Sequence, residues 1–182
     1  MLSFGAARAL LVLHTAIGVS AVATGTHLVI WLRRYLRGEK PRRSTLVFAW
    51  WFFGLSLAAF LLGNTMYPTY KVEVRSAYLE NKSLGEEQAI RDRALSQITG
   101  ERPVTDDLVK RAAKAAKWFD VKEHWIALGL FCSGAVLLIL SLWKPEDGPV
   151  LKPLVLGLAV IACGTTWLGA VIGVLTAAWR AV

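Results

Sequence analysis

The chain contains three histidines, and each lies within or beside a strongly apolar stretch. They are His14, His27 and His124. Ionisable side chains are costly in hydrocarbon, and those that occur there often mark a functional site. Histidines on membrane helices also form ordinary hydrogen bonds to a neighbouring helix. The sequence leaves both interpretations open for each histidine taken alone.

His14 and His124 form the pair that predicts redox chemistry. In a four-span topology the first and third spans run in the same direction, and each of these histidines lies about one or two turns inside its span. They are therefore expected at the same level, near the outer surface. Two imidazoles on parallel helices of a bundle suit the iron of a haem b. The sequence predicts His14 and His124 as the metal ligands of one haem.

Further residues are expected around this haem. Gly18 belongs to a strip of small residues within about 40° of the direction of His14, which leaves room for a flat macrocycle but equally suits close helix packing. The strip consists of Gly18, Ala21 and Gly25. Asn64, at the outer end of the second span, is expected to hydrogen-bond a ligand histidine. Arg75 is expected either to pair with a haem propionate or to be an ordinary surface charge.

His27 does not complete a second haem. It follows His14 by 13 residues, a rise of about 20 Å, but the helix turns by roughly 220° net over that distance. The two side chains therefore point to nearly opposite faces, and the chain has no fourth histidine. His27 is expected to form an inter-helix hydrogen bond or to bind a quinone headgroup.

Four long apolar stretches must position these residues. They cover residues 6–32, 45–67, 118–143 and 151–179. Each exceeds the approximately 20 residues that a helix needs to cross a bilayer, and an irregular backbone cannot face lipid. The sequence predicts an all-α membrane protein, a four-transmembrane-helix bundle forming a single domain over residues 1–182. The pair Gly169 and Gly173 predicts close helix packing, and Cys132 and Cys163 are interpreted as packing residues.

The distribution of cations among the loops predicts the orientation of the chain in the membrane. Cations are dense between the first two spans and present in the short loop between the last two, so the positive-inside rule makes both loops cytoplasmic. The dense cluster comprises Arg33, Arg34, Arg37, Lys40, Arg42 and Arg43. Both termini and the loop 68–117 are then periplasmic in a bacterial inner membrane. This topology accounts for the net charge of +8, and no nucleic-acid partner is expected.

The loop 68–117 is predicted to be a helical cap outside the membrane. Pro68 is expected to kink or end the second helix, and Gly100 and Pro103 to stop a helical segment within the loop. Thr105 is a good N-cap residue. The helix that it begins is expected to continue unbroken into the third span.

The segments "YPTYKVEVRSAYLE" and "WFDVKEHWIALGL" resemble parts of uncharacterised bacterial four-span membrane proteins. The plan of inward histidines on a four-helix bundle is similar to that of membrane b-type cytochromes. That second resemblance covers the bundle plan only, and the chain departs from the dihaem pattern in its number of histidines and in the angle between His14 and His27.

Two functions are compatible with these observations. The first is a membrane electron-transfer subunit with one haem b near the outer face, exchanging electrons with a quinone or a periplasmic carrier. The alternative is a non-catalytic accessory or scaffold subunit of a larger respiratory or photosynthetic membrane complex. Transport is less favoured, because no carboxylate lies at mid-membrane and no pair of helices is broken.

Overall fold

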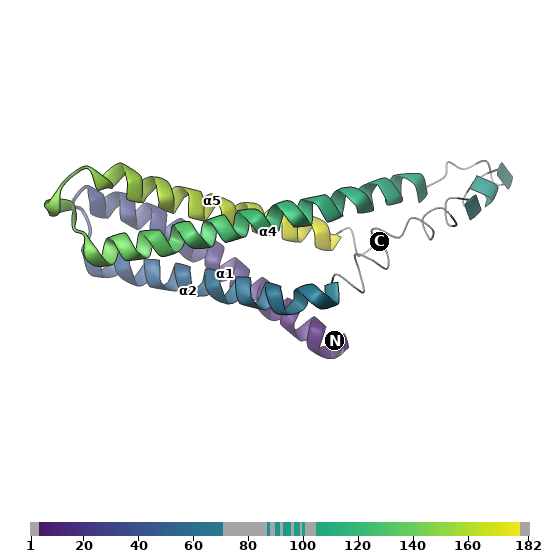
Figure 1. Ribbon diagram of the computed structural model, residues 1–182, viewed down its shortest axis with the longest axis horizontal. Coiled ribbons are helices and arrows are strands. Elements are labelled where there is room, and N and C mark those ends of the chain that lie inside the picture. The colour runs from purple at the N-terminus through teal and green to yellow at the C-terminus, as the bar shows by residue number, and fades with distance from the viewer. Residues whose placement is uncertain are drawn as a thin grey trace.

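The computed structural model describes residues 4–70 and 105–178 and, between them, residues 87, 90–91, 93–95, 97–98 and 100. Its main elements are four long helices and one short 3₁₀ helix, and the described segments contain no strand. The elements are α1 (Phe4–Leu36), α2 (Arg42–Tyr70), α4 (Thr105–Leu142), η2 (Pro145–Asp147) and α5 (Leu151–Ala178) (Figure 1).

All four long helices are long and apolar enough to cross a membrane, judged by length and composition. The membrane-length parts are Arg8–Leu36, Arg42–Tyr67, Asp120–Leu142 and Leu151–Leu175. Large apolar side chains are exposed on every one of them, among them Val12, Trp50, Phe131 and Val174. A soluble protein would bury such surface, whereas a membrane protein places it against lipid. The all-α class and the four membrane-length helices predicted from sequence are confirmed.

The helices form two antiparallel hairpins that pack together. In addition to the hairpin partners α1–α2 and α4–α5, α1 packs on α5 and α2 packs on α4, so α1 and α4 lie diagonally across the bundle. We call the end that carries the connections 37–41 and 143–150 the turn end, and the opposite end the open end. The hairpins lie close together at the turn end, and α1 diverges from α4 and α5 towards its first residue (Figure 1).

The continuous apolar core occupies the half of the bundle nearest the turn end. Its buried residues come from 28–35 of α1, 49–52 of α2, 132–140 of α4 and 155–162 of α5. The largest completely buried side chains in it are those of Leu28, Leu32, Phe52 and Leu140. Cys132 lies in this core, in agreement with its interpretation as a packing residue.

Glycines set the spacing between neighbouring helices. A Cβ atom on Gly25 would collide with the ring of Phe52, so this glycine lets α1 and α2 approach closely. Gly129 similarly leaves no room for a side chain beside Thr165 of α5. Gly169 lies against Ile126, which is the close packing predicted for that residue.

Arg42 joins the two hairpins at the turn end. Its guanidinium donates hydrogen bonds to the Leu140 carbonyl at 2.8 and 3.2 Å and to the Ser141 carbonyl at 2.6 Å. Both carbonyls belong to the last turn of α4, where the backbone has no helical partner. A side chain from the first residue of α2 therefore caps the end of α4.

The second span ends at Tyr67, where the sequence predicted it to end. Helix α2 itself continues for two residues beyond Pro68 to Tyr70, so Pro68 does not end the helix, and a kink at this proline stays a prediction. Helix α4 begins at Thr105 and runs without a break through the third span. Gly100 has a φ of 72°, a left-handed conformation that commonly follows a helix. Residues 87, 90–91, 93–95 and 97–98 of the predicted cap are helical, and the other residues between 71 and 104, apart from Gly100, lie outside the described residues.

Replacement of Arg42 tests the link between the hairpins. Arg42→Gln is expected to lower the free energy of unfolding by roughly 1–3 kcal/mol, because two carbonyls at the end of α4 lose a charged donor. The measurement is thermal unfolding of the full chain in detergent. Arg43→Gln is the matched control, since Arg43 is its exposed neighbour, and an equal loss in both variants would contradict the assigned contact.

Candidate functional site

His14 lies half-buried on the inner side of α1, in the half of the bundle nearest the open end. Its Cε1 atom packs against Gly63 of α2, and its ring hydrogen-bonds to the backbone of Ala59. The other ring nitrogen, Nδ1, is buried and has no hydrogen-bond partner among the described residues. Buried polar atoms are almost always paired, so this nitrogen calls for an explanation.

Lys122 reaches the same part of the bundle from α4. Its ammonium group lies against Gly173 of α5, and it is close enough to His14 for its charge to act on the imidazole. The carboxylate of Glu123 in turn acts on Lys122. The lysine is therefore directed into the bundle and does not extend away from it into solvent.

The spacing along α4 explains this direction. Residues that face the interior follow one another at intervals of three or four, as the 3.6-residue helical repeat requires. This inward stripe consists of Lys122, Ile126, Gly129, Ser133, Val136 and Leu140. Among the side chains that the structure describes, Lys122 is the member of the stripe nearest the open end, one turn beyond Ile126. Lys122 was not among the site residues predicted from the sequence.

His124 lies on a different face of α4. It follows Lys122 by two residues, a rotation of about 200°, and its side chain is exposed. Its Nδ1 lies 2.8 Å from the Asp120 carbonyl of the same helix. The charge of Lys122 thus acts on His14, whereas the exposed His124 side chain is directed away from the interior. The two histidines do not fit as paired ligands of one iron in this arrangement, and the haem stays a prediction from the sequence.

The other residues expected around the haem are separated in the structure. The Cβ position of Gly18 has open space around it, whereas the space beside Gly25 is filled by Phe52. Asn64 is exposed, and it is the preceding residue, Gly63, that faces His14. Arg75 lies outside the described residues. Among the described residues, no group of three or more His, Cys, Asp or Glu side chains is arranged to hold a metal ion.

His27 contacts the neighbouring helix through its ring. The imidazole stacks on Phe48 of α2 with ring centroids 5.8 Å apart and an angle of 17° between the planes. Its Nδ1 lies 2.9 Å from the Ala23 carbonyl of its own helix. His27 is exposed and lies 13 residues along α1 from His14, so it does not contribute to the group formed by His14 and Lys122.

Ser56 adds a second buried polar atom without a partner on the facing helix. Its Oγ lies on α2, seven residues before Gly63, and so on the same side of the helix. Thr45 Oγ1 is a third such atom, but it belongs to the turn end. The seven residues from Ser56 to Gly63 correspond to about 10 Å along the helix, so Ser56 lies at the middle of the bundle and not against His14. We call His14 and Lys122 the open-end site. Together they offer an imidazole and an ammonium group, both of which recognise oxygen atoms of a ligand.

Comparisons of the chain with protein-family models, with curated proteins and with solved structures give no match. Its function is therefore argued from the chemistry of the residues that the fold brings together.

Absorption spectroscopy tests the placement of the two histidines. Because the His124 ring faces away from the interior, His124→Ala is expected to leave any b-type α band in the reduced-minus-oxidised spectrum unchanged. A band lost in both His14→Ala and His124→Ala would show that the two imidazoles meet and would contradict this placement. A wild-type spectrum without such a band would remove the haem prediction itself.

Proposed function

We propose that this chain is a membrane subunit of an electron-transfer system that binds a quinone-class headgroup at the open-end site. The observation that carries the proposal is the buried Nδ1 of His14, which has no hydrogen-bond partner among the described residues and lies within range of the Lys122 charge. The sequence predicted two possible ligands, haem b and a quinone. A single inward histidine with a lysine in range suits a quinone better than a haem.

Histidine chemistry supports a ligand with two redox forms. When the imidazole is neutral, the nitrogen bonded to Ala59 carries the hydrogen, so Nδ1 is an acceptor that suits a quinol hydroxyl. When the ring is protonated, Nδ1 becomes a donor that suits a quinone carbonyl. The Lys122 ammonium donates in both cases. Both forms of the headgroup therefore find partners without rearrangement of the helices.

Local charge and side-chain size support a neutral, flat headgroup. The carboxylate of Glu123 acts on Lys122, which reduces the net positive charge that an anionic ligand would require. The residues next to His14 and Lys122 are glycines, Gly63 and Gly173, and the Cβ position of Gly18 has open space around it. The lack of a side chain on Gly63 and Gly173 lets His14 and Lys122 pack against the helix backbones, and the open space beside Gly18 allows the approach of a planar ring.

The predicted orientation of the chain determines which side of the membrane the open-end site faces. With the connections 37–41 and 143–150 on the cytoplasmic side by the positive-inside rule, the open end faces the periplasm of a bacterial inner membrane. A quinone reaches such a site through the bilayer, and the electron carrier that exchanges with it belongs to a partner protein.

Direct binding measurements test this function. Titration of the full chain in nanodiscs with a short-chain ubiquinone or menaquinone, followed by quenching of tryptophan fluorescence, is expected to saturate. His14→Ala and Lys122→Met should each weaken binding by roughly tenfold, the loss expected for one hydrogen bond to a buried or charged group. His27→Ala and His124→Ala are the matched controls and should bind as the wild type does. Binding that does not saturate, or that is equally weakened in all four variants, would overturn the proposal.

A second candidate, the accessory or scaffold subunit, is favoured by the outer face of α5. Gly157 and Gly164 are exposed seven residues apart on this face, and nothing lies near their Cβ positions. Val160 and Val171 are exposed beside them. Small residues at such spacing allow a second membrane helix to approach closely, and this role is compatible with quinone binding.

The size of the particle extracted from native membranes tests the accessory role. If α5 packs on a partner, Gly164→Leu is expected to shift the chain from a larger complex to the monomer on a native gel, because the side chain holds the partner helix away. Ala16→Leu, at an exposed position of α1, is the matched control. A wild-type chain that is already monomeric would exclude this candidate.

A further inference from the structure

We propose that the cleft at the turn end binds the phosphate of an anionic phospholipid headgroup. The cleft lies between the connection of α1 to α2 and the connection of α4 to α5, and its volume is about 700 Å³. Such a volume is within the range of small-molecule sites. This inference concerns the opposite end of the bundle from the open-end site and does not depend on the proposed quinone.

The lining of the cleft is strongly basic. Five cationic side chains and a single carboxylate contribute to it. They are Arg37, Lys40, Arg42, Lys144 and Lys152, with Glu146. Cations this close together repel one another in the empty protein, and a bound phosphate relieves that repulsion.

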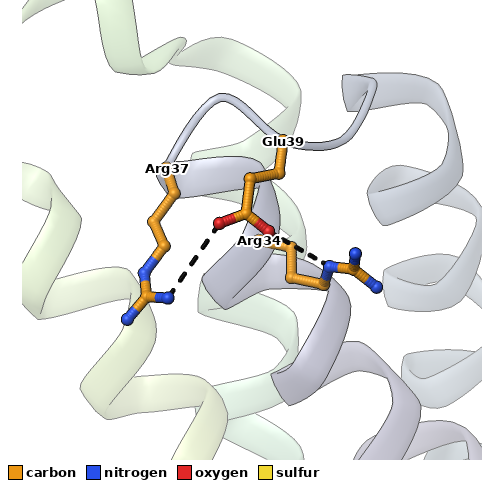
Figure 2. A network of polar contacts seen from close by, with 3 residues as sticks. All are labelled: Arg34, Arg37 and Glu39. Carbon is orange, nitrogen blue, oxygen red and sulfur yellow. Dashed lines mark hydrogen bonds and ion pairs between the residues drawn. The ribbon is translucent and has the colours of Figure 1, made fainter.

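Three of these cations have partners in the structure. Two of the three partners are uncharged, so they do not neutralise the cation. Arg42 donates to neutral carbonyls, and Lys40 lies over the Trp31 ring at 4.8 Å. Arg37 lies 4.0 Å from Glu39, which also pairs with Arg34 at 3.2 Å (Figure 2). Glu39 therefore balances part of the charge of the first connection. The second connection carries its own carboxylates, Glu146 and Asp147, and in the described part of the chain neither forms an ion pair with Lys144 or Lys152.

Lys144 and Lys152 are the cations left for a ligand. Neither forms an ion pair with any residue in the part of the chain that the structure describes. Lys144 precedes η2 and Lys152 lies in the first turn of α5, so the two ammonium groups belong to opposite ends of the second connection. A phosphate has enough oxygen atoms to accept hydrogen bonds from both.

The height of the cleft indicates a lipid as the source of the phosphate. The membrane-length segments end or begin at Leu36, Arg42, Leu142 and Leu151, each at or within three residues of a lining residue. The cleft is therefore level with the phospholipid headgroups. Leu142 and Val150 are exposed at the same level and provide apolar surface for acyl chains. Basic pockets between helices at the cytoplasmic surface are a recognised form of anionic-lipid site.

Lipid retention separates this site from the general attraction of a basic surface. Native mass spectrometry of the full chain, released from nanodiscs of phosphatidylcholine mixed with phosphatidylglycerol, counts the lipid that stays bound. We expect the wild type to retain phosphatidylglycerol and the Lys144→Gln, Lys152→Gln double variant to bind it roughly tenfold or more weakly. The Lys144→Arg, Lys152→Arg variant should retain it, which shows that the positions tolerate substitution.

The matched control removes the same charge outside the cleft. Arg33 and Arg43 are exposed and do not line it, so Arg33→Gln with Arg43→Gln should change retention by no more than about threefold. Equal losses in the two glutamine variants, or no preference of the wild type for phosphatidylglycerol, would overturn the proposal. Stabilisation of the wild type by inorganic phosphate in phosphatidylcholine nanodiscs, equal to that given by phosphatidylglycerol, would identify a soluble ligand and overturn the lipid assignment.

Discussion

The interior of the bundle is filled unevenly along its length, and both candidate sites depend on this difference. Near the turn end, Phe52, Leu32 and Leu140 are completely buried and hold the two hairpins together. Towards the open end, the buried positions are mostly glycine, alanine and threonine, and Gly129 and Gly169 draw α4 and α5 together. Large side chains therefore fix the geometry at one end, and small residues surround the polar groups towards the other end.

In a membrane, polar groups on the helices must find hydrogen-bond partners within the protein, because hydrocarbon offers none. Most hydroxyls on the helices bond a carbonyl one turn earlier, as Thr15 and Ser20 do. Trp167, deep in the last span, donates its indole N–H to Thr26 of α1 at 3.1 Å, which satisfies the indole and links two helices. Among the described residues, His14 Nδ1, Ser56 Oγ and Thr45 Oγ1 depart from this pattern. A buried polar atom without a partner costs free energy, and for His14 the proposed ligand would recover that cost.

The sequence was sufficient to predict the helices but not the direction of every side chain. Apolar length predicted the four membrane-length helices, and the cap at Thr105 predicted the start of α4, because both depend on local chain properties. His124 was paired with His14 on depth alone. The rotation of α4 about its axis determines the side of the helix on which His124 lies. That side could have been inferred from the inward stripe that runs from Lys122 through Gly129 to Leu140. A lysine is normally expected at the surface, so the inward position of Lys122 was not predicted.

The cleft at the turn end could not be predicted from any local pattern in the sequence. Its cations come from two connections about a hundred residues apart in the chain, and the positive-inside rule explains each group without placing them together. Arg42 brings them together, because its guanidinium joins the start of α2 to the end of α4. The same arginine thereby contributes charge to the cleft and holds Lys144 near the first connection. The cations that set the orientation of the chain thus form one basic surface once the hairpins pack together. The packing of Phe52, Leu32 and Leu140 maintains that surface.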